Sequence, residues 1–235
     1  MRKEQSGGAR LNQFGGGRGK SGLVLLHTAE THVGTFQKLL RELAPSLPCA
    51  HLVAADLLDL AQTGGFSGSL RARLRERLSD IARDAPRLVL CTCSTLGALA
   101  EELAREEGVE LLRLDRALAD AAVAAGRRIL VLAAVPSTMA PTGALFEEVA
   151  ARSGREIEVD LRLVEGAWAL FEGGDFGGYH ARIAEAARRR ASGADVVVLA
   201  QASMAPAADL MRDMPIPVLS SPVLGVKRAL AILAG

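Results

Sequence analysis

The sequence has few aromatic residues, few cysteines and no long apolar run. Only 3% of its 235 residues are aromatic and 3 are cysteine. The longest apolar run, 129–136, has about eight residues, whereas a membrane-spanning helix needs about 18. The sequence therefore predicts no membrane span. An odd number of cysteines in a chain that can bury its own core argues against a disulfide framework and favours a reducing compartment.

The chain also lacks a strong excess of charge, with a formal net charge of +1. Residues 1–21 hold five Lys or Arg and one Glu, so the rest of the chain is slightly acidic. A nucleic acid or an anionic membrane requires clustered cations, and both partners are therefore excluded. We expect the Gly-rich segment 1–21 to be a disordered tail. It has no apolar core typical of a secretory signal, so we expect a cytoplasmic protein.

From Leu23 onward, short β-branched and Leu-rich runs alternate with helical segments, which is typical of parallel strands covered by crossover helices. The predicted class is α/β. The segment 156–164 alternates apolar and charged residues, which predicts a half-exposed strand at a sheet edge. The other strands are expected to be buried, and a helix is expected after each. The predicted strands are 23–27, 50–54, 87–91, 109–114, 129–134, 156–163, 195–200 and 216–220.

The sequence repeats on itself. Residues 23–40 match 130–146 at an offset of about 107, and residues 90–103 match 198–211 at an offset of about 108. Both offsets describe two copies of one four-strand unit. Such a duplication fits either two facing domains or two halves of a barrel, and in both cases the carboxyl ends of the strands form the site.

The segment "CTCST" (91–95) holds the best candidate for a reactive group. Cys93 follows a predicted strand and precedes a predicted helix, whose positive N-terminal end is expected to lower the pKa of a thiol. Cys91, within the strand, and Cys49 are expected to be inert packing residues. No metal is expected at the Cys-x-Cys pair, because zinc needs four ligands and no further Cys or His stands at a suitable spacing.

These residues and the duplication resemble the aspartate/glutamate/hydantoin racemase superfamily, whose members carry one Cys at an equivalent elbow in each half. The matching elbows here are 91–95 and 199–205, and "PSTMAPT" (136–142) also resembles the family. The resemblance implies two pseudo-symmetric, flavodoxin-like parallel-sheet domains facing across a cleft. The first would comprise 22–113 plus 221–235, and the second 114–220. It further implies cofactor-independent chemistry at a carbon next to a carboxylate or carbonyl, with thiols as acid and base.

The sequence departs from the family pattern at one decisive position. Gln201 is paired with Cys93, and an amide neither gains nor loses a proton near neutral pH. A two-thiol racemisation is therefore excluded. Three reactions remain: protonation of an enolate after decarboxylation of a malonate-type acid, thiol addition to a double bond with rotation, and racemisation shared with a base such as His27 or His32. Binding of a small carboxylate without catalysis also remains open.

Several polar residues are candidates for binding the substrate carboxylate or a developing oxyanion. Gln201 is expected to be a hydrogen-bond donor rather than a base. No cofactor is expected, and the partner is expected to be a small carboxylate; a homo-oligomer is compatible with the sequence. The Gly- and aromatic-rich segment 166–183 fits either a connector or a lid over the cleft. The remaining binding candidates are Ser94, Thr95, Thr138, Ser203, His27 and Thr31.

Overall fold

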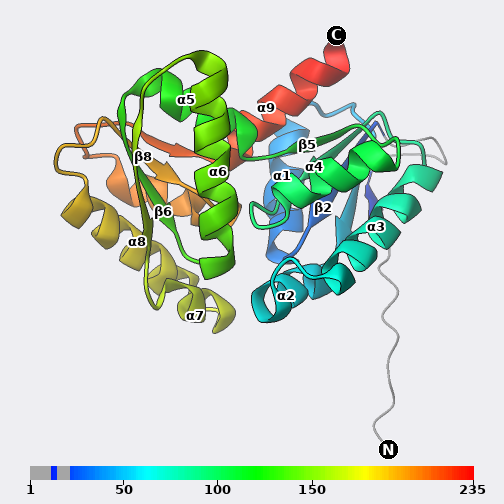
Figure 1. Cartoon of the computed structure of the whole chain (residues 1–235), viewed down its shortest axis with the longest axis horizontal. Helices are drawn as coiled ribbons and strands as arrows, with labels where there is room; N and C mark the ends of the chain where they lie inside the picture. Colours follow the sequence, from blue (N-terminus) through cyan, green and yellow to red (C-terminus); the bar gives the residue numbers. More distant parts are fainter. Residues whose placement is uncertain (1–11, 15–21) are drawn as a thin grey trace, which may run out of the picture.

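The computed structural model describes residues 12–14 and 22–235, which form two β-sheets side by side (Figure 1). The first sheet has the order β1-β3-β2-β4-β5 and the second the order β7-β6-β8-β9. Neighbouring strands are parallel except β1, which pairs antiparallel with β3. The strands are β1 (Asn12–Phe14), β2 (Leu23–His27), β3 (Cys49–Val53), β4 (Leu88–Cys91), β5 (Leu111–Arg113), β6 (Arg128–Ala133), β7 (Glu158–Leu163), β8 (Val196–Leu199) and β9 (Val218–Ser220).

Helices follow the parallel strands, as the sequence predicts. One of them departs from the expected form: after β8 the chain makes a 3₁₀ helix, η1, with Pro206 inside it. The helices are α1 (Thr31–Leu43), α2 (Ala55–Gly64), α3 (Gly68–Arg83), α4 (Gly97–Glu106), α5 (Arg116–Ala125), α6 (Pro136–Ser153), α7 (Ala167–Glu172), α8 (Phe176–Arg190), η1 (Ala202–Met211) and α9 (Ser221–Ala234).

The two sheets share one topology once β1 is set aside. In each, the first strand of the unit lies between the second and the third, and the fourth lies beside the third. This is the flavodoxin-like order, and it places β2 in correspondence with β6 and β4 with β8. The predicted α/β class with two pseudo-symmetric parallel-sheet domains is therefore confirmed.

Both faces of each sheet are covered by apolar clusters. Successive side chains of a strand point to opposite faces, so alternate residues join different clusters. Val24 and Leu26 belong to one apolar cluster of the first sheet, whereas Leu23 and Leu25 belong to another. The second sheet is covered on both faces in the same way. Strands buried on both faces read as continuous apolar runs, which explains why the sequence predicted them well.

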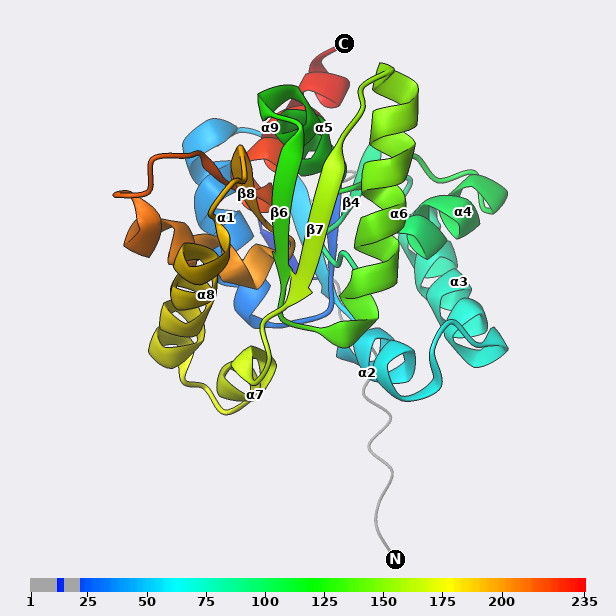
Figure 2. The same cartoon turned by 60° about the vertical axis from the view of Figure 1, so that its left-hand side comes forward.

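The strand β9 was expected to be buried but is half-buried throughout. The strand β7 is half-exposed, as predicted. It lies at the edge of the second sheet, and its residues alternate between exposed and half-buried (Figure 2). Near the N-terminus, Asn12–Phe14 extend the first sheet as strand β1. The sequence predicts disorder throughout 1–21, so this part of the prediction is wrong. The rest of that expectation concerns residues outside those that the structure describes.

The helix α9 returns to the first sheet. Its residues Val226, Ala229 and Leu233 pack in one cluster with Leu23 and Leu25 of β2. In Figure 1 it runs from the second sheet across the top of the molecule towards the first. The domain boundaries at 113/114 and 220/221 stay a prediction. In 22–235, no helix is long and apolar enough to cross a membrane.

Candidate functional site

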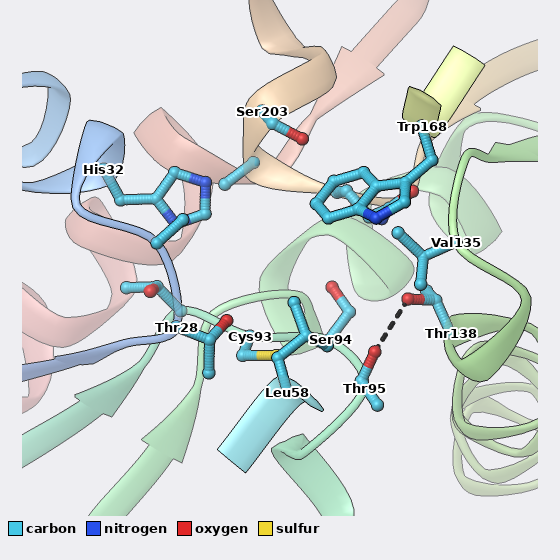
Figure 3. A pocket seen from close by; sticks show the side chains of 14 residues that line it. Thr28, His32, Leu58, Cys93, Ser94, Thr95, Val135, Thr138, Trp168 and Ser203 are labelled. Carbon is cyan, nitrogen blue, oxygen red and sulfur yellow. Dashed lines mark hydrogen bonds between the residues drawn. The ribbon is translucent and has the colours of Figure 1, made fainter. Parts of the chain in front are cut away.

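A small cavity lies between the two sheets, at the carboxyl ends of the two central strands of each. Its volume of about 30 Å³ admits only a few water-sized groups. Typical ligand pockets hold about 300 Å³ or more, so a bound carboxylic acid requires the lining to open. Figure 3 shows the cavity from close by. It is lined by Thr28, Ala29, His32, Leu58, Thr92, Cys93, Ser94, Thr95, Val135, Thr138, Trp168, Gln201, Ala202 and Ser203.

Cys93 lies in this lining, just beyond the end of β4, and its side chain is 8% exposed. Burial raises the pKa of the Cys93 thiol, whereas hydrogen bonds from the Thr28 side chain and from the Leu96 and Thr95 backbone act to lower it. The expectation of a lowered pKa is therefore wrong. Helix α4 begins only at Gly97, and burial outweighs the donors near its start. The resting form of Cys93 is the neutral thiol.

The other two cysteines lie elsewhere. Cys91 is buried within β4, as predicted, and its thiol donates to the Cys93 carbonyl oxygen at 3.7 Å. Burial raises the pKa of Cys91 strongly. Cys49 is half-buried at the start of β3 and lines a different surface depression.

Gln201 lines the cavity from the end of β8, the position that corresponds to Cys93 in the repeat. Its side-chain oxygen accepts a hydrogen bond from the Ala134 backbone N–H at 2.6 Å. This contact turns the oxygen toward the backbone that follows β6. The amide nitrogen, which only donates, is then the end available to a ligand.

Three of the predicted hydroxyl groups join the two halves of the cavity. The Ser94 hydroxyl donates to the Ala200 carbonyl oxygen at 2.8 Å, across 106 residues of sequence. The hydroxyls of Thr95 and Thr138 lie 2.9 Å apart (Figure 3). The Thr95 hydroxyl also lies 3.3 Å from that of Ser137. These side chains bring the second sheet against the first, in addition to lining the cavity.

A family model for the Asp/Glu/hydantoin racemases matches residues 78–229, a range that contains both elbows. The chain belongs to the Asp/Glu/hydantoin racemase family. Among curated proteins, none matches the sequence significantly.

Solved structures of racemases share the fold of this family member. Glutamate racemase from Francisella tularensis, solved with D-glutamate, is 13% identical, with 92% of this chain and 81% of that chain covered and a TM-score of 0.70. A glutamate racemase isoform from Bacillus anthracis is 13% identical, with 91% and 82% covered and a TM-score of 0.72. An arylmalonate decarboxylase is 14% identical, with 91% and 92% covered and a TM-score of 0.56.

Two side chains of α8 form hydrogen bonds to Ser203. Its hydroxyl lies 2.9 Å from the Tyr179 hydroxyl, and its carbonyl oxygen accepts from His180 at 3.0 Å. Trp168, from α7 of the same segment, lines the cavity and stacks on Phe171 with ring centroids 4.8 Å apart. In this racemase-family chain the aromatic segment therefore contributes Trp168 to the cavity lining, and Tyr179 and His180 contact Ser203.

Two predicted binding residues lie away from the cavity lining. Thr31 is exposed at the start of α1. His27 is buried, with Nδ1 2.8 Å from the Thr92 hydroxyl and Nε2 2.9 Å from His51 Nδ1. The Thr92 hydroxyl donates its one proton to the Leu26 carbonyl oxygen, so His27 Nδ1–H donates to Thr92 and His51 Nδ1–H donates to His27. His27 positions the strand end that precedes Cys93.

His32 enters the cavity from α1. Both of its ring nitrogens are buried and have no hydrogen-bond partner in 22–235. Burial lowers the pKa of His32 to about 4, so the ring is neutral at pH 7. The sequence named His32 only as one possible base, because nothing in its spacing shows which loop histidine faces the site.

A buried ion pair lies at the end of β5, and no sequence signal indicated it. Arg113 donates to both Asp115 oxygens, at 2.7 and 3.0 Å, and both side chains are buried. Arg116 pairs with Glu101 at 2.6 Å. A Cβ on Gly97 would lie 2.8 Å from Arg113 Nε, so this position needs glycine. In the described lining of the cavity itself, no Asp, Glu, Lys or Arg occurs.

Proposed function

We propose that this chain is a cofactor-independent, racemase-like isomerase that acts at the carbon next to the carboxylate of a small amino acid or organic acid. The observation that carries the proposal is the Cys93 thiol, which lines a cavity closed by both sheets and faces no other sulfur there. Family membership supports isomerisation at such a carbon. The odd number of cysteines supports a reducing, cytoplasmic location.

The chemistry needs a proton to leave the α-carbon and a proton to return. Loss of the α-proton to a base leaves an enolate, whose negative charge lies on the carboxylate oxygens. The Gln201 amide nitrogen, whose oxygen is held by the Ala134 backbone, would donate to these oxygens. Each fixed donor of this kind lowers the barrier by about 3 kcal/mol. The Cys93 S–H then gives its proton to the carbon and becomes a thiolate.

Decarboxylation is the second candidate, and the direction of the Cys93 pKa shift favours it. Loss of CO₂ from a malonate-type acid breaks the carbon–carbon bond and leaves its electron pair in an enolate. One proton donor then completes the reaction, and a thiol whose pKa is raised by burial is such a donor. Isomerisation through thiol addition to a double bond requires the thiolate instead, which burial disfavours.

A panel of acids in D₂O tests the proposal. The panel contains both enantiomers of aspartate, glutamate, 2-phenylpropionate and 2-methylsuccinate, together with phenylmalonate and maleate. For the wild type we expect α-deuterium uptake with inversion and without CO₂ loss. For Cys93→Ser we expect the rate of inversion to be at least 100-fold lower. Cys49→Ser, at the start of β3 and outside the cavity lining, is the matched control and should behave as the wild type.

Other outcomes identify the alternatives. Release of CO₂ from phenylmalonate, with deuterium in the product, supports the decarboxylase. Conversion of maleate to fumarate supports addition and rotation. Binding of a panel acid by calorimetry, without exchange, CO₂ loss or isomer change, contradicts catalysis and supports a carboxylate-binding protein.

A further inference from the structure

The imidazole of His32 is the one histidine ring of 22–235 for which both nitrogens are buried without a partner. His27 bonds to Thr92 and His51, and His180 bonds to the Ser203 carbonyl oxygen. A buried polar atom without a partner costs about 1–3 kcal/mol, so natural structures retain few of them. His32 keeps two such atoms at the wall of the cavity.

The surroundings of His32 in the protein supply no polar partner for the ring. Its centroid lies 6.1 Å from that of His27 and 6.3 Å from that of Phe36, both edge-to-face. In Figure 3 the ring lies across the cavity from Trp168, with Thr28 and Cys93 below it. A ligand in the cavity would therefore meet the ring nitrogens as well as the sulfur.

A ring nitrogen of His32 can accept a proton from the substrate, which the Gln201 amide cannot do. A neutral imidazole accepts a proton on its unprotonated nitrogen, whereas an amide does not near neutral pH. Gln201, the partner of Cys93 in the repeat, thus leaves one face of the substrate carbon without a base. His32 reaches the same cavity from the other strand end of the first sheet, beyond β2.

We infer that His32 contacts the bound carboxylic acid and carries the second proton of the reaction, on the face of the carbon turned away from Cys93. This inference rests on the proposed function. In one direction His32 takes the α-proton and becomes imidazolium, the carbon–hydrogen electron pair moves into the enolate, and Cys93 S–H protonates the opposite face. In the reverse direction the thiolate takes the proton and imidazolium returns one, so atoms and charges balance over the two directions.

The substrate itself assists the transfer. Burial holds the pKa of His32 at about 4, which keeps the ring unprotonated and ready to accept. A carboxylate bound within a few ångströms stabilises the imidazolium and raises that pKa toward the range useful for a base. The base is therefore strengthened only when the acid is bound.

The decisive experiment is α-hydrogen exchange in D₂O, measured separately for the two enantiomers of 2-phenylpropionate and of glutamate, at an alkaline pH at which iodoacetamide labelling shows that Cys93 is present as the thiolate. For His32→Asn we expect racemisation to fall at least 100-fold, while one enantiomer still exchanges its α-hydrogen without inversion. Cys93→Ser should show the mirror result, with exchange surviving only in the other enantiomer. Equal loss of exchange for both enantiomers in His32→Asn, or unchanged racemisation, overturns the inference.

A second measurement works without turnover. In ¹⁵N NMR of the histidine rings, saturating 2-phenylpropionate or glutamate should move the resonances of His32 and leave those of His27 and His51 in place. Movement supports contact even if His32→Asn folds poorly, and no movement with either acid overturns the inference. A wild type that exchanges no panel acid but shows the His32 shift refutes the proposed function while supporting the contact.

Discussion

The Ser94 hydroxyl donates a 2.8 Å hydrogen bond to the Ala200 carbonyl oxygen, so the residue after Cys93 is tied to the residue before Gln201. The bond joins the two elbows of the duplicated fold directly. It therefore holds the chain segment that carries the thiol against the segment that carries the carboxamide.

Replacement of Ser94 should therefore destabilise the chain. Ser94→Ala leaves the Ala200 carbonyl without its donor in a buried setting, which costs about 1–3 kcal/mol of unfolding free energy. Urea unfolding measures this loss. Ser153→Ala removes an exposed hydroxyl that bonds to Ala150 and should change stability by less than about 0.5 kcal/mol. Equal effects of the two variants would contradict the role of Ser94.

The buried Arg113–Asp115 pair should be more sensitive than any surface pair. Asp115→Asn leaves the Arg113 charge buried without its carboxylate, and we expect a loss of about 3–5 kcal/mol. Asp209→Asn, which breaks the exposed pair with Arg212, should cost less than about 1 kcal/mol. Chemical denaturation of both variants tests the contrast, and similar losses would show that burial of the first pair is unimportant.

Stability should fall as the pH drops below about 6.5, the usual pKa of an unfolded histidine. Burial lowers the pKa of His32 to about 4, and burial with the neighbouring His32 and His51 lowers that of His27. Between these pKa values the unfolded chain binds protons that the folded chain does not bind. The free energy of unfolding therefore keeps its full value above about pH 6.5 and decreases progressively toward about pH 4. For His32 the loss at pH 5 is about 2 kcal/mol. Urea unfolding at pH 7.5 and 5.0 should show a smaller drop for His32→Asn; an equal drop would refute this assignment.

Cys93 should react slowly with iodoacetamide near pH 7 and much faster above pH 9, because burial raises its thiol pKa. The Thr28 side chain stabilises the thiolate, so Thr28→Val should slow alkylation further. Peptide mapping distinguishes Cys93 from Cys49 and Cys91. A Thr28→Val variant that labels as fast as the wild type would contradict the Thr28 contact.

The uncharged lining predicts a preference among acids. An α-ammonium group would be buried without a carboxylate partner, which is costly, whereas a methyl group fits beside Leu58 and Val135. We expect 2-methylsuccinate to bind at least 10-fold more tightly than aspartate in calorimetry. Leu58→Asp should reverse the order, and Leu58→Asn should not. Tighter aspartate binding by the wild type would contradict the prediction.

The fold was predictable because its main signals are local. Strands such as β4 and β8 are buried on both faces, so they read as apolar runs, and the offset of the repeat is enough to pair Cys93 with Gln201. The ten-residue 3₁₀ helix η1 was not predictable, since its apolar pattern also fits an α-helix.

The electrostatics of the site were not predictable, because they depend on packing between distant segments. The raised pKa of Cys93 follows from burial, in a cavity that Leu58 and Trp168 help to line from α2 and α7. The His27–His51 bond joins residues 24 positions apart on neighbouring strands, and neither position carries a sequence signal for the other.

The return of α9 to the first sheet has a consequence for how the protein is made. Val226, Ala229 and Leu233 cover the face of β2 formed by Leu23 and Leu25, yet they are translated more than 100 residues after β5 ends. During synthesis, this apolar face of the N-terminal sheet therefore stays incompletely covered until the second sheet and α9 have left the ribosome. Nascent chains stalled before Val226 should accordingly expose that face to chaperones and proteases.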